Sequence, residues 1–137
     1  MEIIELIQSL YGKYCQLCTP LTEQEYKNAV GTIPDELLEI LKVSNGINEV
    51  MIHPKVDNGK PFVIGSVVLS LDGMKSETER YLDEHGSTGT VFCGDGAGGS
   101  FVLKPDGKVY LYDRYLAEEE LYADSLQEFW KKWDSES

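Results

Sequence analysis

Apolar residues recur every three or four positions between Ile3 and Tyr14, and this spacing predicts an amphipathic helix. Further along, Thr22 and Glu25 have the spacing of a capping box, so a second, short helix is expected to end at Gly31. Comparable start and stop signals place the expected helices at residues 3–14, 22–31, 34–44 and 72–85 and from residue 125 onward.

The hydrophobic pattern changes after Asn45-Gly46, where segments rich in valine, isoleucine and aromatic residues begin. Turn signals separate them, at Asp57-Asn58-Gly59 and at Pro105-Asp106-Gly107. The expected strands are residues 47–53, 61–70, 90–93, 100–104 and 108–113. No internal repeat and no linker rich in glycine, serine or proline divides the chain, so one domain is expected over residues 1–137.

Charge narrows the classes of partner. Twenty-four acidic and twelve basic side chains give a net charge of −12, which argues against nucleic acid and favours a basic partner. The same charge also keeps an ordinary cytosolic protein soluble. The start of the chain lacks the positive charge of a secretory signal, and the longest apolar run, residues 62–69, is far shorter than the ~20 residues of a membrane span. We therefore expect a cytoplasmic protein that does not enter a membrane.

Gly94, Gly96 and Gly99 match G-x-G-x-x-G, the pattern that holds the pyrophosphate of a dinucleotide. That pattern works only where the glycine turn leads into a helix, whose N-terminal amides bind the phosphates. Here the turn leads into an expected strand beginning at Ser100. The sequence therefore predicts a glycine-rich connection between two antiparallel strands and no bound nucleotide.

The cysteines and histidines allow a weak case for chemistry. Cys15 and Cys18 have the C-x-x-C spacing of half a zinc site or of a redox pair, and Cys93 with His53 or His85 would have to complete the ligands. The alternative is that the two cysteines are small, partly buried residues closing a helix. Both histidines stand outside any catalytic motif and are expected to be solvated at the ends of their elements. We expect reduced cysteines, no metal, no cofactor and no catalytic residues.

The strand at residues 108–113 carries bulky groups on both faces, because Tyr110 and Tyr112 alternate with Val109 and Leu111. Such a strand is usually central in its sheet. Two interpretations remain open: the tyrosines lie beneath a layer of helices, or they line a concave face with Asp113 and contact a partner.

The densest acidic run is Glu118-Glu119-Glu120. A run of this kind is either a solvated loop or an electrostatic handle for a basic partner.

Two stretches in this order resemble the SUKH superfamily, also called the Smi1/Knr4 family. The first is LTEQEYKNAVGTIPDELLEILKVSNGI, residues 21–47, and the second is VFCGDGAGGSFVLKPDGKVYLYD, residues 91–113, closed by SLQEF at residues 125–129. The positions at the expected offsets are Pro34, Leu37, Ile40, Leu41, Asn45 and Gly46. The chain departs from the family pattern at Gly99, where Asn or Asp is common, at Arg114, where a histidine often stands, and at Leu37 and Ile40, which replace aromatic residues.

The resemblance implies an α+β fold, with a mainly antiparallel β-sheet packed against helices, and no enzyme activity. In bacteria it implies an immunity protein that binds and neutralises a secreted polymorphic toxin, often a nuclease, by covering its active face, with no small-molecule substrate. Two rivals are a regulatory or scaffold module, which is the role of eukaryotic members, and a zinc or thiol-redox protein built on the cysteines.

The expected contact surface combines the acidic run with the end of the strand before it. An aromatic anchor inside a charged rim concentrates binding energy while the rim steers association. The expected partner-binding residues are Asp95, Tyr112, Asp113, Glu118, Glu119 and Glu120, with Tyr112 as the anchor.

Overall fold

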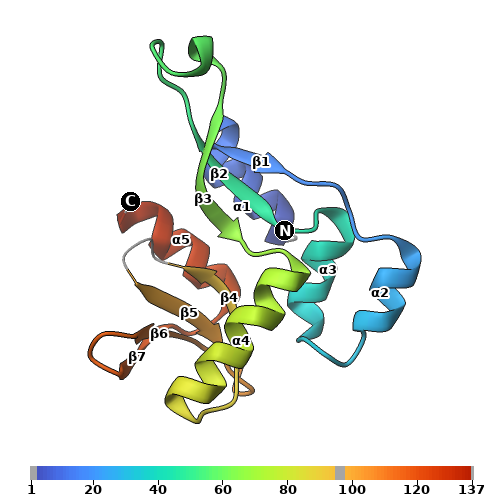
Figure 1. Ribbon diagram of the computed structural model, residues 1–137, viewed down its shortest axis with the longest axis vertical. Helices are drawn as coiled ribbons and strands as arrows, with labels where there is room; N and C mark the ends of the chain where they lie inside the picture. Colours follow the sequence, from blue (N-terminus) through green and yellow to red (C-terminus); the bar gives the residue numbers. More distant parts are fainter. Residues whose placement is uncertain (1–2, 95–97, 137) are drawn as a thin grey trace.

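Figure 1 shows a computed structural model of the protein, which describes residues 3–94 and 98–136. Its helices are α1 (Ile3–Tyr11), α2 (Glu23–Ala29), α3 (Asp35–Val43), α4 (Leu71–His85) and α5 (Leu126–Glu136), with short 3₁₀ turns η1 (Gly12–Tyr14) and η2 (Asp57–Gly59). Its strands are β1 (Cys15–Leu17), β2 (Ile47–Met51), β3 (Phe62–Val68), β4 (Thr90–Gly94), β5 (Gly99–Leu103), β6 (Val109–Asp113) and β7 (Glu118–Ala123).

The strands form two antiparallel sheets, one in the order β1-β2-β3 and one in the order β4-β5-β6-β7. The sheets approach one another where the Leu69 N–H donates to the Phe92 carbonyl, 2.8 Å away. With helices packed against both sheets, the fold is α+β, as the sequence predicts (Figure 1).

Local signals set several helix ends. Thr22 and Glu25 form the predicted capping box: the Thr22 hydroxyl accepts from the Glu25 N–H, and the Glu25 carboxylate accepts from the Thr22 N–H. Gly86 ends α4 in the left-handed conformation, with φ of 70°. Gly12 adopts φ of 52°, which stops α1 three residues before the end of the predicted helix at Tyr14.

The two faces of the four-stranded sheet bury different partners. On one face, Val91, Val102 and Tyr112 pack against Tyr81 of α4. On the other, Phe92 and Phe101 contact Phe129 of α5 through edge-to-face rings. The sheet is thus covered by a helix on each side, and β6 lies between β5 and β7, the central position predicted from its two-sided pattern.

Two strands escaped prediction. No strand was expected between the first two helices, yet Cys15–Leu17 pairs with β2. β7 contains the acidic run, which is neither a loop nor solvated throughout, because Glu118–Ala123 pairs along β6 as an edge strand. The strand context of the glycine motif is confirmed, since β4 pairs antiparallel with β5 across it and no helix begins at Ser100.

Candidate functional site

The end of the β6–β7 hairpin gathers most of the predicted partner-binding residues. Asp113 pairs with Glu118 and Leu111 with Glu120 in the antiparallel register. A depression of about 450 Å³ lies here, lined by Leu111, Asp113, Leu116, Glu118, Glu119 and Glu120. We call this region, residues 111–120, the acidic end. The sixth predicted residue, Asp95, lies outside the described residues.

Three of these carboxylates are available to a partner. Glu118 and Glu120 are exposed and Asp113 is half-buried. None of the three forms an ion pair with a residue in the ranges 3–94 and 98–136. Their charges therefore remain uncompensated on one surface, which attracts positive charge over roughly one Debye length, about 8 Å at physiological salt.

Glu119, unlike its neighbours in the acidic run, forms hydrogen bonds inside the protein. Its carboxylate turns toward α4, where it accepts hydrogen bonds from the Tyr81 hydroxyl and from Lys104 Nζ, the second at 2.6 Å. Lys104 also donates to the Ser87 hydroxyl, and His85 Nε2 lies 3.6 Å from Glu119. Only 11% of the Glu119 side chain is exposed. Glu119 therefore supports the acidic end from inside through this network, and its contact with a partner stays a prediction.

The contacts around Glu119 shift the pKa values of Tyr81 and Lys104. Burial of the ring, followed by the hydrogen bond to Glu119, raises the pKa of Tyr81. Burial alone would lower the pKa of Lys104, but the hydrogen bonds to Glu119 and Tyr81 outweigh it, and the pKa of Lys104 rises. Both shifts indicate that the folded protein favours the protonated, charged form of Lys104 and the protonated, neutral form of Tyr81.

Tyr112 is not a surface anchor. Only 2% of it is exposed, because α4 covers it: the Tyr81 ring lies 5.3 Å away and the His85 ring 4.9 Å away, centroid to centroid. Of the two interpretations of the β6 tyrosines, the helix layer holds for Tyr112. His85 is likewise packed at the end of α4 and not freely solvated, which corrects the expectation for that residue.

The exposed aromatic group at this end is Tyr115, which sequence reasoning missed. It is 82% exposed and its neighbour Leu116 is 64% exposed. Both belong to the turn between β6 and β7, where the Tyr115 and Leu116 N–H groups donate to Asp113 Oδ1 at 2.9 and 3.2 Å. An aspartate at the end of a strand is a turn signal, and it would have indicated that the next side chains point outward.

The turn that carries Tyr115 is held from several sides. Arg114 lies 3.6 Å from Glu77 and 3.4 Å from Glu84, so its guanidinium ties the turn to α4. A Cβ at Gly98 would overlap the Tyr115 ring, which places the ring directly against Gly98, the residue before β5. Ala117 closes the turn at φ of 52°, a conformation uncommon outside glycine and asparagine. The two apolar side chains are therefore presented in one fixed arrangement.

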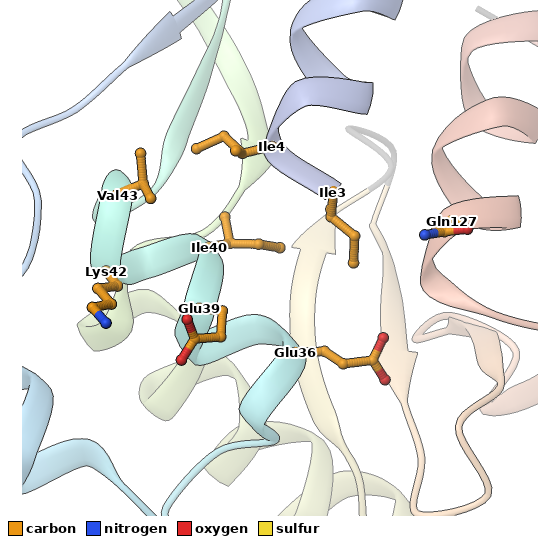
Figure 2. Close-up of a pocket in the computed structure, with 8 residues that line it drawn as sticks. All are labelled: Ile3, Ile4, Glu36, Glu39, Ile40, Lys42, Val43 and Gln127. Atoms are coloured by element: carbon orange, nitrogen blue, oxygen red, sulfur yellow. The ribbon is translucent and has the colours of Figure 1, made fainter. Parts of the chain in front are cut away.

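A second concave region lies among α1, α3 and α5 (Figure 2). Its volume is about 530 Å³, and Ile3 of α1 and Ile40 of α3 point into the space between the helices. Two of its charged groups are engaged outside it, since Glu39 accepts from the Tyr26 hydroxyl at 3.0 Å and Lys42 Nζ lies 5.1 Å from the Tyr26 ring centroid. This groove offers apolar contact through its isoleucines and Val43. It is lined by Ile3, Ile4, Glu36, Glu39, Ile40, Lys42, Val43 and Gln127.

The cysteines are free thiols, with Cys93 buried and Cys15 and Cys18 half-buried. Burial raises the pKa of the Cys15 thiol, which disfavours the thiolate that metal binding or redox chemistry requires. Within residues 3–94 and 98–136, no three histidine, cysteine, aspartate or glutamate side chains are grouped as metal ligands. In the same residues, no helix has both the length and the apolar character of a membrane span.

Comparison with known families places the chain. The profile of the SMI1 / KNR4 family (SUKH-1) matches residues 18–132, most of the chain, and the protein belongs to this family. No curated protein gives a significant match. The matched segment includes the whole acidic end, whereas α1, which contributes one wall of the groove in Figure 2, precedes it.

Proposed function

We propose that this protein is a bacterial immunity protein, which binds a basic protein toxin of the nuclease type and neutralises it by covering its active face. Membership of the SMI1 / KNR4 family supports a role in binding a protein partner. The observation that carries the proposal is the acidic end, where the uncompensated charges of Asp113, Glu118 and Glu120 lie beside the exposed Tyr115 and Leu116.

The two kinds of side chain have separate tasks. Carboxylates at the rim raise the rate of encounter with a basic surface by long-range attraction, by roughly 10–10³-fold at low salt. Tyr115 supplies a large contact area with few rotatable bonds and remains in contact once water is excluded around it. A nuclease surface is basic because it holds a polyanion, so occupation of that surface by the acidic end blocks the substrate without any chemical step.

The inhibitor needs no catalytic group. It needs a surface that keeps its shape, and the ties of Arg114 to α4 and of Asp113 to the turn provide that shape. We also propose that residues 1–137 act as one domain, since one apolar cluster includes Ile47 and Val67 of one sheet and Phe101 and Val109 of the other. The proposed place of action is the cytoplasm.

The test takes as candidate toxins the nuclease domains encoded by the genes that neighbour the gene of this chain. The purified toxin is titrated with the chain, and nuclease activity is followed on a fluorescent substrate; we expect full inhibition at an equimolar ratio. A Glu118→Lys, Glu120→Lys double variant should inhibit at least about tenfold less well, because it replaces attraction by repulsion at the contact. The matched control is Glu23→Lys, Glu36→Lys, which makes the same change of charge on exposed sites of α2 and α3.

Equal loss of inhibition in both double variants would show that overall charge, and not the acidic end, drives binding. Binding of the toxin with undiminished nuclease activity would exclude occlusion as the mechanism. A non-inhibitory complex of that kind would favour the regulatory or scaffold role known for eukaryotic members of the superfamily.

A further inference from the structure

A second surface lies at the other end of the molecule, on the hairpin formed by β2 and β3. We call residues 51–64 the arm. Figure 1 shows it projecting beyond the rest of the protein, away from the β6–β7 turn. Five of its large apolar side chains are between 38% and 56% exposed, and they are Met51, Ile52, Val56, Val63 and Ile64. Exposed apolar side chains in this number on one hairpin indicate a site of contact with another molecule.

The arm is an ordered structure. Val50 pairs with Val63 and Met51 with Phe62 across the hairpin. At its tip, the Lys60 N–H donates to the Asp57 carbonyl and the Gly59 N–H to the Val56 carbonyl, both at 3.0 Å. The apolar side chains therefore stand on a preformed scaffold. A contact made with such a scaffold loses little conformational entropy, which favours binding.

Charge separates the arm from the rest of the surface. It carries Lys55 and Lys60 against a single acidic residue, Asp57, whereas the whole chain has twice as many acidic as basic side chains. A basic toxin would find little attraction here. Another molecule with a strong negative charge, in contrast, can approach the arm without meeting an acidic surface.

We propose that the arm is the contact surface between two copies of this chain. Each copy carries a net charge of −12, so two copies repel one another wherever their acidic surfaces meet. Contact through the two arms brings together two apolar surfaces that carry one acidic residue each. It also holds the acidic ends apart and accessible, so that the dimer remains open to a partner at each end.

The register of β3 indicates how the arms meet. Its pairing with β2 shifts between Ile47 and Asn48 and again between Glu49 and Val50. Irregularities of this kind interrupt the edge of a sheet and hinder addition of another strand. The contact is therefore formed by side chains, with Val63 and Ile64 meeting the same residues of the second copy around a two-fold axis.

The first measurement is sedimentation velocity of the wild-type chain over a dilution series from micromolar to near-millimolar, at low and high salt. We expect a monomer–dimer equilibrium in which salt strengthens association, because it screens the repulsion between two negatively charged copies. A wild-type chain that stays monomeric at every concentration and at both salt levels would overturn the proposal.

Variants locate the contact. Val63→Glu, Ile64→Glu and Val63→Lys, Ile64→Lys should each weaken dimerisation at least about tenfold. Equimolar mixing of the two should restore a dimer, because opposite charges then face one another. Leu82→Glu, at a 50% exposed site on α4, is the control and should dimerise as the wild type does. Failure of the mixture to dimerise, with both variants folded by circular dichroism, would contradict an arm-to-arm contact.

A third variant leaves the apolar side chains intact. Lys55→Glu, Lys60→Glu changes two exposed positions and should weaken the dimer at low salt and recover it at high salt. Dimerisation that is unchanged by this variant at low salt would place the contact elsewhere. If the arm variants alter affinity for the toxin while the wild type is monomeric, the arm belongs to the toxin interface and the dimer proposal is wrong.

Discussion

The acidic end and the arm are both hairpin ends that hold apolar side chains in water, yet they differ in the charge around those side chains. Asp113, Glu118 and Glu120 surround the exposed pair at the acidic end, whereas two lysines and one aspartate accompany the arm. The exposed apolar side chains favour contact with another molecule at both ends. Under the two proposals, these charges select the kind of molecule that each end binds, and the two contacts should respond to salt in opposite ways.

The two ends also rest on different foundations. The acidic end is supported by side-chain charge, through Lys104 with Glu119 on one side and Arg114 with Glu84 on the other. The arm is supported by backbone hydrogen bonds at its tip, such as that from Lys60 to Asp57. Changes of charge or pH should therefore affect the stability of the acidic end far more than that of the arm.

The largest expected effect separates two tyrosines of the acidic end. Tyr112→Ala removes a buried ring under α4 and should lower the free energy of unfolding by about 3–4 kcal/mol. Tyr115→Ala removes an exposed ring and should leave stability within about 0.5 kcal/mol, while weakening toxin binding by about 10–100-fold. Denaturant unfolding and titration calorimetry with the toxin measure the two quantities. A Tyr115→Ala variant that binds the toxin with wild-type affinity would show that Tyr115 is not the anchor.

The next prediction tests the ion pair of Lys104 with Glu119, which supports the acidic end. Lys104→Met leaves the Glu119 carboxylate with the Tyr81 hydroxyl and, 3.6 Å away, the His85 ring, and should cost about 2–3 kcal/mol of unfolding free energy. Lys108→Met changes an exposed lysine close by and should cost less than about 0.5 kcal/mol. Equal losses in the two variants would show that the network contributes nothing.

The same network predicts a response to alkaline pH. The pKa values of Lys104 and Tyr81 are raised in the folded state, so the proton is held more tightly there than in the unfolded chain. Their contribution to stability is complete below about pH 10 and is lost as pH rises through the folded pKa values. Unfolding in urea between pH 8 and pH 11 should therefore show a steeper alkaline loss for the wild type than for Lys104→Met.

A smaller effect concerns the acidic rim. Glu118→Gln, Glu120→Gln should slow toxin association several-fold and flatten its dependence on salt, with dissociation nearly unchanged. Stopped-flow measurements at two salt concentrations give both slopes. Glu119→Gln is the informative contrast, because it should lower stability through the loss of the Lys104 pair. If the double variant keeps the wild-type association rate and salt dependence, the toxin contact does not lie on β7.

The smallest effect compares the two turns. Ala117 in the β6–β7 turn and Asn58 at the tip of the arm both have φ near 50–60°. Asparagine tolerates this conformation better than alanine, so Ala117→Gly should stabilise the protein by up to about 1 kcal/mol and Asn58→Gly by less. Thermal unfolding of both variants measures the difference. A larger gain at Asn58 would contradict the strain assigned to the β6–β7 turn.

The sequence by itself determined the features that depend on neighbouring residues. The capping box of Thr22 and Glu25, the left-handed end of α4 at Gly86 and the strand after the glycine motif each follow from a few adjacent side chains. Local hydrogen bonds and backbone sterics fix these features, and they do not depend on the rest of the fold. The same local reasoning placed β6 at the centre of its sheet.

Only the tertiary structure decided which side chains of the acidic end face outward. Glu118-Glu119-Glu120 has poor strand propensity, but pairing with β6 makes it an edge strand, and the alternation of a strand then turns Glu119 inward and its neighbours outward. Tyr112 is buried because α4, distant in sequence, packs over it. Burial of a side chain depends on how helices pack on the sheet. The residue pattern of β6 predicted bulky side chains on both faces, but it did not show which face a helix covers.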